Sequence, residues 1–200
     1  MPSSRGIYDR DNYDTGRSNA DELYNGLAGL DGIVLQKHLH REGIGLDWAR
    51  DSIVAAQQPD IVIIHRSSFF HPIAAQLKLG YSPFAKDEEL KQWQAIYDAA
   101  DARLRSFIRL VGAVEPQTQF LIYSRGTDRN WLDDAFRAEW TRTLEQELPA
   151  LEGRINTMVI SKKENGEKGT FRDPATMEKV CARVREMLKK LEERKAEKRN

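Results

Sequence analysis

The chain has 200 residues, and its 31 basic and 31 acidic side chains give a formal net charge of zero. This length suits one domain, or one domain with tails, and it can enclose a full hydrophobic core. The balanced charge excludes a global field that favours nucleic acid or an anionic membrane surface, so any anion site must be local.

Residues 1–17 are rich in Asp, Arg, Asn and Gly, a composition that predicts a loosely held arm. They lack the apolar region of a signal peptide, and no apolar run in the chain reaches the ~20 residues that a membrane span needs. We therefore expect a soluble, cytoplasmic protein with neither a membrane nor a nucleic-acid partner.

The first helix is predicted to begin at Ser18-Asn19, which can act as an N-cap, because leucines then recur at helical spacing. A candidate strand, GIVLQKHL, follows at 32–39. Asp47 can cap a helix that ends before Pro59. The next segment, DIVII at 60–64, is a continuous β-branched run, which is typical of a strand covered on both faces.

The strongest helix prediction covers residues 87–112. Its apolar residues alternate in spacings of three and four; they are Leu90, Trp93, Tyr97, Ala100, Leu104, Phe107 and Val111. Pro116 separates this helix from QFLIYS at 119–124, which is a second candidate for a buried strand.

Asn130 with Asp133 can open another helix, whose apolar residues repeat every four positions: Leu132, Phe136, Trp140, Leu144 and Leu148. INTMVIS at 155–161 is a third strand of the same type. Asp173-Pro174 then has the favoured order of a cap and a first helical residue. The final helix carries the single cysteine, Cys181, which cannot form an internal disulfide and is predicted to be a small core side chain.

Helices and strands alternate, and several strands are too apolar to face water. This order predicts an α/β domain, a three-layer α/β/α sandwich with a parallel, flavodoxin-like sheet. The domain is expected to cover residues 18–188, with residues 189–200 as a charged helical extension.

Polar side chains follow the predicted strands. In an open parallel sheet, ligands bind outside the carboxyl ends of the strands, where successive loops converge. The strand ends supply His38 and His40; His65, Arg66, Ser67 and Ser68; Ser124, Arg125, Gly126, Thr127 and Asp128; and Ser161 with Lys162.

These residues have both functional and structural interpretations. In a catalytic site, His65 would be the proton acceptor, Ser67 or Ser124 the nucleophile and Asp173 a further catalytic group. Serines in loops more commonly cap or turn the chain, and the capping pattern at Asp173-Pro174 favours a helix cap over a catalytic acid.

The ligand-binding hypothesis names five residues: His38, Arg66, Ser68, Arg125 and Asp128. The two arginines could form a fork around a phosphate or carboxylate, or they could pair with Asp60 or Asp128. His38 and His40 share a strand face and could bind a metal, but no Cys or carboxylate with metal-ligand spacing accompanies them. No metal or other cofactor is therefore expected.

Several stretches together resemble a known family. They are a helix ending at PDIVII, the polar strand end HRSS, the segment VEPQTQFLIYS, the late strand INTMVIS, and TFRDPATMEKVCARVREML before the last helix. From about residue 20 onward the chain resembles the SGNH (GDSL) hydrolases, which place oxyanion donors at the position of HRSS. That family carries an Asp-x-x-His motif before its last helix, and Asp173 matches its Asp.

The resemblance has three departures. Thr176 stands where the family has its general-base His, the Gly-Asp-Ser nucleophile triplet is missing, and His65-Arg66-Ser67-Ser68 replaces Gly-x-Asn-Asp. A threonine hydroxyl cannot accept a proton at neutral pH. The resemblance therefore implies an SGNH-like fold that is either an atypical hydrolase or a binding-only descendant.

Two other α/β families share single features. Receiver domains have a strand like PDIVII but end it in a phosphoacceptor Asp, where this chain has His65. The segment FLIYSRGTDRNWLDDAF is similar to the start of a TIR domain.

The first hypothesis is thus a small-molecule site at the strand ends. The alternative is a non-enzymatic signalling or assembly module, whose protein partners contact the helices at 87–112 and 174–199.

Overall fold

The computed structural model describes residues 19–31, 33, 57–69, 87–124, 129–160 and 171–197. The predicted arm at 1–17, the strand at 32–39 and most of the helix after Asp47 lie outside these ranges. Among the helices that are described, none combines the length and the apolar character needed to cross a membrane.

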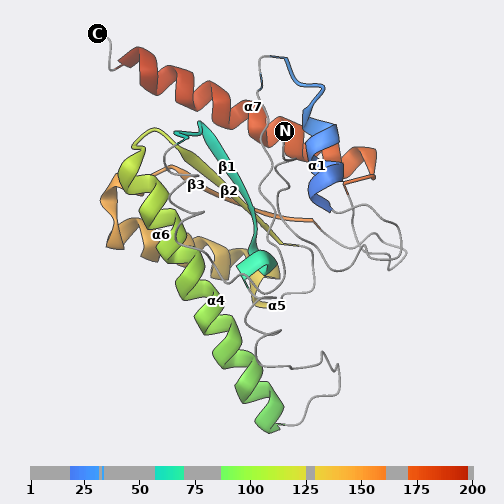
Figure 1. The fold of residues 1–200 in the computed structure, drawn as a ribbon, viewed down its shortest axis with the longest axis vertical. Helices are drawn as coiled ribbons and strands as arrows, with labels where there is room; N and C mark the ends of the chain where they lie inside the picture. Colours follow the sequence, from blue (N-terminus) through green and yellow to red (C-terminus); the bar gives the residue numbers. More distant parts are fainter. Residues whose placement is uncertain are drawn as a thin grey trace.

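Three strands form a parallel sheet in the order β1-β2-β3: β1 (Ile61–His65), β2 (Gln119–Ser124) and β3 (Ile155–Val159). The strands predicted at 60–64, 119–124 and 155–161 are therefore confirmed, and so is their parallel direction. Because all three run the same way, their carboxyl ends lie at one edge of the sheet (Figure 1). In the register, His65 pairs with Tyr123, and Ser124 pairs with Val159.

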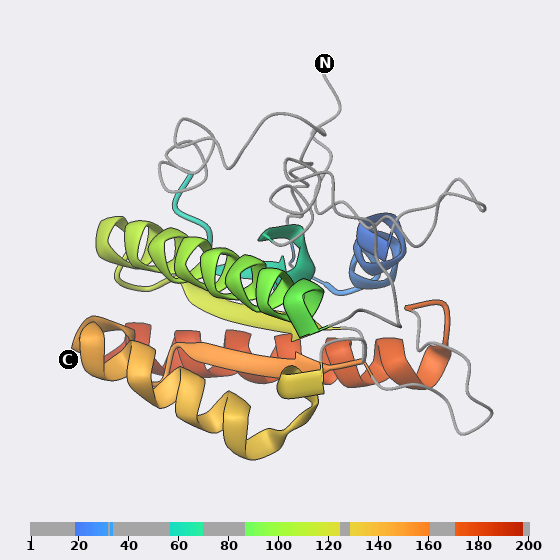
Figure 2. The ribbon, with the colours of Figure 1, turned by 90° about the horizontal axis from the view of Figure 1, so that it is seen from below.

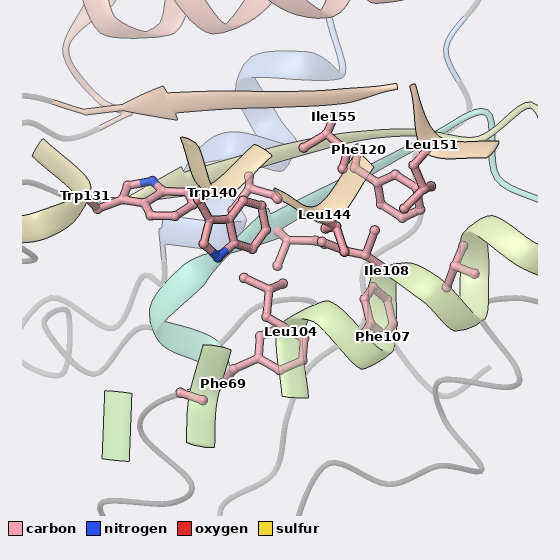
Figure 3. Packing of buried hydrophobic residues seen from close by; sticks show 14 of the residues in the cluster. Phe69, Leu104, Phe107, Ile108, Phe120, Trp131, Trp140, Leu144, Leu151 and Ile155 are labelled. Carbon is pink, nitrogen blue, oxygen red and sulfur yellow. The ribbon is translucent and has the colours of Figure 1, made fainter. Parts of the chain in front are cut away.

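One face of the sheet is covered by α4 (Asp87–Val114) and α6 (Asp134–Glu147), with η2 (Arg66–Phe69), α5 (Arg129–Leu132) and η3 (Pro149–Leu151) at its margins. Figure 3 shows the core on this side. Its members come from the strands, from α4 and from α6; they include Ile64, Phe120, Ile122, Leu104, Ile108, Trp140 and Leu144. Four members of the stripe predicted for α4 are buried, namely Ala100, Leu104, Phe107 and Val111, and the structure adds Ile96 and Ile108 to it.

The opposite face is covered by α7 (Pro174–Glu197) and α1 (Asn19–Leu27), as Figure 2 shows. Leu121 and Tyr123 of the central strand pack there with apolar residues of both helices, including Leu23, Val180, Val184 and Met187. Cys181 is buried in this layer, as predicted.

The helix α4 is much longer than the sheet that it covers. Its 28 residues span about 42 Å at the α-helical rise of 1.5 Å per residue. Its amino-terminal part therefore continues past the carboxyl ends of the strands (Figure 1). This overhang lies beside the edge of the sheet where a ligand site is expected.

The helix predicted from Asn130 is divided in two. Asp133 ends α5 and caps α6, because its carboxylate accepts a hydrogen bond of 2.8 Å from the amide of Ala135. The break changes the phase of the predicted apolar stripe, so Leu132 and Phe136 are 45% and 36% exposed while the later members of the stripe are packed in the core.

Candidate functional site

Arg66 immediately follows β1 and turns to the α4 side of the sheet. Its guanidinium carbon lies 4.7 Å from the centre of the Trp131 ring, and Nη2 lies 3.8 Å from Oδ1 of Asp101. Burial lowers the pKa of Arg66, while the negative charge of Asp101 and the nearby Tyr97 act in the opposite direction. A guanidinium has so high a pKa that Arg66 still carries its positive charge.

A cation–aromatic cluster holds Arg66 in place; we define it as Arg66, Asp101, Arg105, Trp131 and Trp140. The carboxylate of Asp101 accepts hydrogen bonds from the indole of Trp140 at 2.7 Å and from Nε of Arg105 at 2.9 Å. Arg105 lies over Trp140 at 4.9 Å, and the two indoles pack edge to face at 5.2 Å (Figure 3). Arg66 and Arg105 thus share the carboxylate of Asp101. Arg105 also lies 3.8 Å from Glu147, which pairs with Arg109, so these three guanidinium groups and two carboxylates carry one net positive charge.

Ser124 lies at the carboxyl end of the central strand and is 5% exposed. Side chains alternate between the two faces of a strand, so Ser124 shares a face with Phe120 and Ile122, which pack against α4. Ser124 and Arg66 are therefore brought to the same side of the sheet.

His65 emerges on the opposite face. Its ring, 3% exposed, stacks on Tyr123 at 4.7 Å with an interplanar angle of 16°, and Tyr123 meets Phe171 edge to face at 5.2 Å. These partners belong to the layer of α7 and α1. The sheet thus separates the imidazole of His65 from the hydroxyl of Ser124, although the two residues end neighbouring strands.

Asp173 caps α7. Its Oδ2 accepts hydrogen bonds from the amide and the hydroxyl of Thr176, at 3.3 and 2.8 Å, and its carbonyl accepts one of 3.0 Å from the amide of Met177. Pro174 is the first helical residue. The capping interpretation of Asp173 is therefore confirmed, and its catalytic role stays a prediction.

The remaining predicted site residues are described in part or not at all. Ser67 and Ser68 lie on η2, after Arg66, but the structure describes only their backbone. His38, Arg125 and Asp128 lie outside the described residues, together with His40, Gly126, Thr127, Ser161 and Lys162. Asp60 is not a partner of Arg66 here: it pairs with Lys195 at 3.0 Å, at the other end of β1.

Sequence reasoning missed Asp101, Trp131 and Tyr123 as neighbours of the site. A signal exists for Asp101, because it lies four residues from both Tyr97 and Arg105, on a helix face next to the predicted apolar stripe. No such signal marks Trp131, whose contact with Arg66 joins segments 65 residues apart.

Within the described ranges, no three His, Cys, Asp or Glu side chains come together as a metal-binding group. No protein-family model matches the chain, and neither a curated protein nor a solved structure matches it. The chemistry of this edge must therefore be argued from its own residues.

Proposed function

We propose that this protein binds a small anionic ligand at the carboxyl edge of its sheet, on the side covered by α4. In this proposal Arg66 is the charged anchor, and the hydroxyl of Ser124 is a hydrogen-bonding partner. Ser68, Arg125 and Asp128, which follow the same two strands in the sequence, would complete the site.

The observation that carries the proposal is the position of Arg66. Its charge is held beside Trp131, and the linked ion pairs around it have three guanidinium groups for two carboxylates. Partial burial strengthens electrostatic attraction, since the surrounding dielectric constant is lower than that of water. The planar fork of an arginine also matches the geometry of phosphate and carboxylate groups.

The geometry favours binding over hydrolysis. A nucleophilic serine needs its general base within hydrogen-bonding reach, but His65 and Ser124 emerge on opposite faces of the sheet. Asp173 bonds to Thr176 at the start of α7. We therefore propose the binding-only form of an SGNH-like domain, a three-layer sandwich whose two outer layers are supported by the helices on both faces of the sheet.

Calorimetric titration with inorganic phosphate tests the proposal, with sodium chloride of equal ionic strength as the reference. We expect the wild type to bind phosphate and Arg66→Gln to bind it at least about tenfold more weakly, because a charge-assisted hydrogen bond contributes ~1.5–3 kcal/mol.

Arg183→Gln is the matched control for this titration. It removes a guanidinium on α7, which covers the other face of the sheet, where Arg183 pairs with Glu186 at 2.7 Å. We expect Arg183→Gln to keep the affinity of the wild type for phosphate. Absence of binding in the wild type, or equal binding by Arg66→Gln, would contradict the proposal.

A screen of simple esters and phosphoesters tests the hydrolytic form separately. The binding-only proposal predicts no turnover by the wild type or by His65→Ala. Turnover that disappears in His65→Ala would overturn the binding-only form and restore His65 as the proton acceptor.

The overhang of α4 favours a second candidate, a signalling or assembly module. A helix that continues past the sheet offers a surface to a partner, and the long α7 offers another (Figure 1). The two candidates differ in the titration, because an assembly module does not bind phosphate, whereas both candidates predict no turnover in the screen.

A further inference from the structure

Asp101 is the acidic member of the cation–aromatic cluster, and both of its carboxylate oxygens accept hydrogen bonds. Oδ1 accepts one of 2.7 Å from the indole of Trp140, and Oδ2 accepts one of 2.9 Å from Nε of Arg105. Trp140 is itself packed in the core and only 4% exposed. The carboxylate is therefore held in one orientation and cannot rotate away from a neighbouring charge.

The same carboxylate lies beside the proposed anchor of the anion. Oδ1 of Asp101 is 3.8 Å from Nη2 of Arg66, and the side chains of Asp101 and Arg66 are 22% and 12% exposed, so a ligand can reach both. An anion oxygen that accepts a charge-assisted hydrogen bond from Nη2, at about 2.8 Å, is then close to Oδ1 as well. Oδ1 can accept a second hydrogen bond, since a carboxylate has about four acceptor positions.

A carboxylate in this position discriminates between anions by the protons that they carry. An ionised oxygen beside Oδ1 is repelled, and the repulsion is strong because both groups are partly removed from water. An oxygen that carries a proton instead donates a short, charge-assisted hydrogen bond to the carboxylate. Inorganic phosphate keeps a proton at neutral pH, and a phosphomonoester keeps one below its second pKa of about 6, whereas sulfate and its esters have none.

We propose that Asp101 is the specificity-determining residue of the anion site, and that it restricts the site to phosphoryl groups that carry a proton. This inference rests on the proposed function, because it needs an anion bound to Arg66. The linked ion pairs attract any anion through their net positive charge, so charge alone does not distinguish a phosphate from a sulfate. The fixed carboxylate of Asp101 supplies that distinction.

Calorimetric titration of the wild type with methyl phosphate and with methyl sulfate, at about pH 5, tests the proposal. This pH lies below the second pKa of a phosphomonoester, about 6, so both ligands are monoanions of similar shape and only methyl phosphate carries a proton. We expect methyl phosphate to bind at least about tenfold more tightly. Equal affinities, or tighter binding of methyl sulfate, overturn this inference and leave the proposed function intact, whereas binding of neither anion contradicts both.

The variant Asp101→Asn tests the role of the carboxylate itself. Its amide keeps the shape of the side chain but removes the negative charge, so we expect the affinity for methyl sulfate to rise about tenfold and the preference for methyl phosphate to disappear. A gain of affinity cannot arise from a loss of folding. Asp98→Asn is the matched control, because it removes the same charge from the exposed face of α4, where Asp98 accepts a hydrogen bond of 2.8 Å from Gln94. A folded Asp101→Asn that still rejects methyl sulfate, or an equal gain in Asp98→Asn, overturns the proposal.

Discussion

Arg154 binds four backbone carbonyls at the amino-terminal end of the sheet. It is 2% exposed, and its guanidinium donates to the carbonyls of Thr118, Ala150 and Glu115 at 2.8 Å and of Gly112 at 3.4 Å. Burial lowers its pKa, and the neighbouring charge of Arg194 adds to this effect. Through these hydrogen bonds, Arg154 links the carboxyl-terminal end of α4 to the turns that precede β2 and β3.

Replacing Arg154 should destabilise the protein strongly. Arg154→Met keeps much of the volume but leaves buried carbonyl groups without donors, so we expect the free energy of unfolding to fall by about 2–4 kcal/mol. Urea denaturation measures this change. Arg142→Met, which removes an exposed guanidinium paired with Glu139, should leave the midpoint unchanged. A shift of the same size in both variants would contradict the structural role of Arg154.

Two substitutions test the capping role of Asp173. Asp173→Ala removes the acceptor for the amide of Thr176, so we expect a loss of about 1 kcal/mol in the free energy of unfolding. Asparagine caps helices as well as aspartate, so Asp173→Asn should keep the stability of the wild type. Thermal and urea unfolding measure both variants. An equal loss of stability in the two variants would show that the carboxylate charge, and not the cap, is what matters.

Close packing between elements decides whether a glycine can be replaced. A Cβ built at Gly112, near the end of α4, would lie 2.6 Å from Cδ2 of Leu151, which is fully buried in η3. The same Cβ would lie 3.7 Å from Nη2 of Arg154. The backbone of α4 therefore approaches η3 too closely for a side chain.

Gly112→Ala should destabilise the protein although alanine favours helices by about 1 kcal/mol. Overpacking a filled core costs about 1–3 kcal/mol, which exceeds that gain. Urea denaturation should show a net loss. Gly29→Ala serves as the control, because a Cβ at Gly29 meets no atom within 4 Å. A more stable Gly112→Ala would mean that Leu151 moves aside freely.

The elements themselves were largely predictable from the sequence. The segments predicted as strands at 60–64, 119–124 and 155–161 are confirmed as β1, β2 and β3, because short apolar runs with β-branched and aromatic residues, bounded by turn signals, favour strands. The helix at 87–112 is confirmed and extends to Val114. The division between α5 and α6 was not predicted, because Asn130 and Asp133 are both good caps and only the packing selects between them.

At the scale of the whole molecule, the register of the parallel sheet decides which strand-end residues meet. The sequence predicts that His65 and Ser124 both end strands, and this is confirmed. It does not predict that His65 pairs with Tyr123, and a shift of one residue would move every side chain of a strand to the other face. The sequence could therefore predict that the candidate site lies at this edge of the sheet, but it could not predict which side chains meet there.

Residue-specific NMR during a phosphate titration tests the central claim most directly. Our account predicts that the largest shifts fall on the amides of Arg66 and Ser124 and on the indole of Trp131, while the side chain of His65, on the other face, is unaffected. Shifts centred on His65 and Phe171, or scattered without a centre, would contradict an anion site on the α4 side of the sheet.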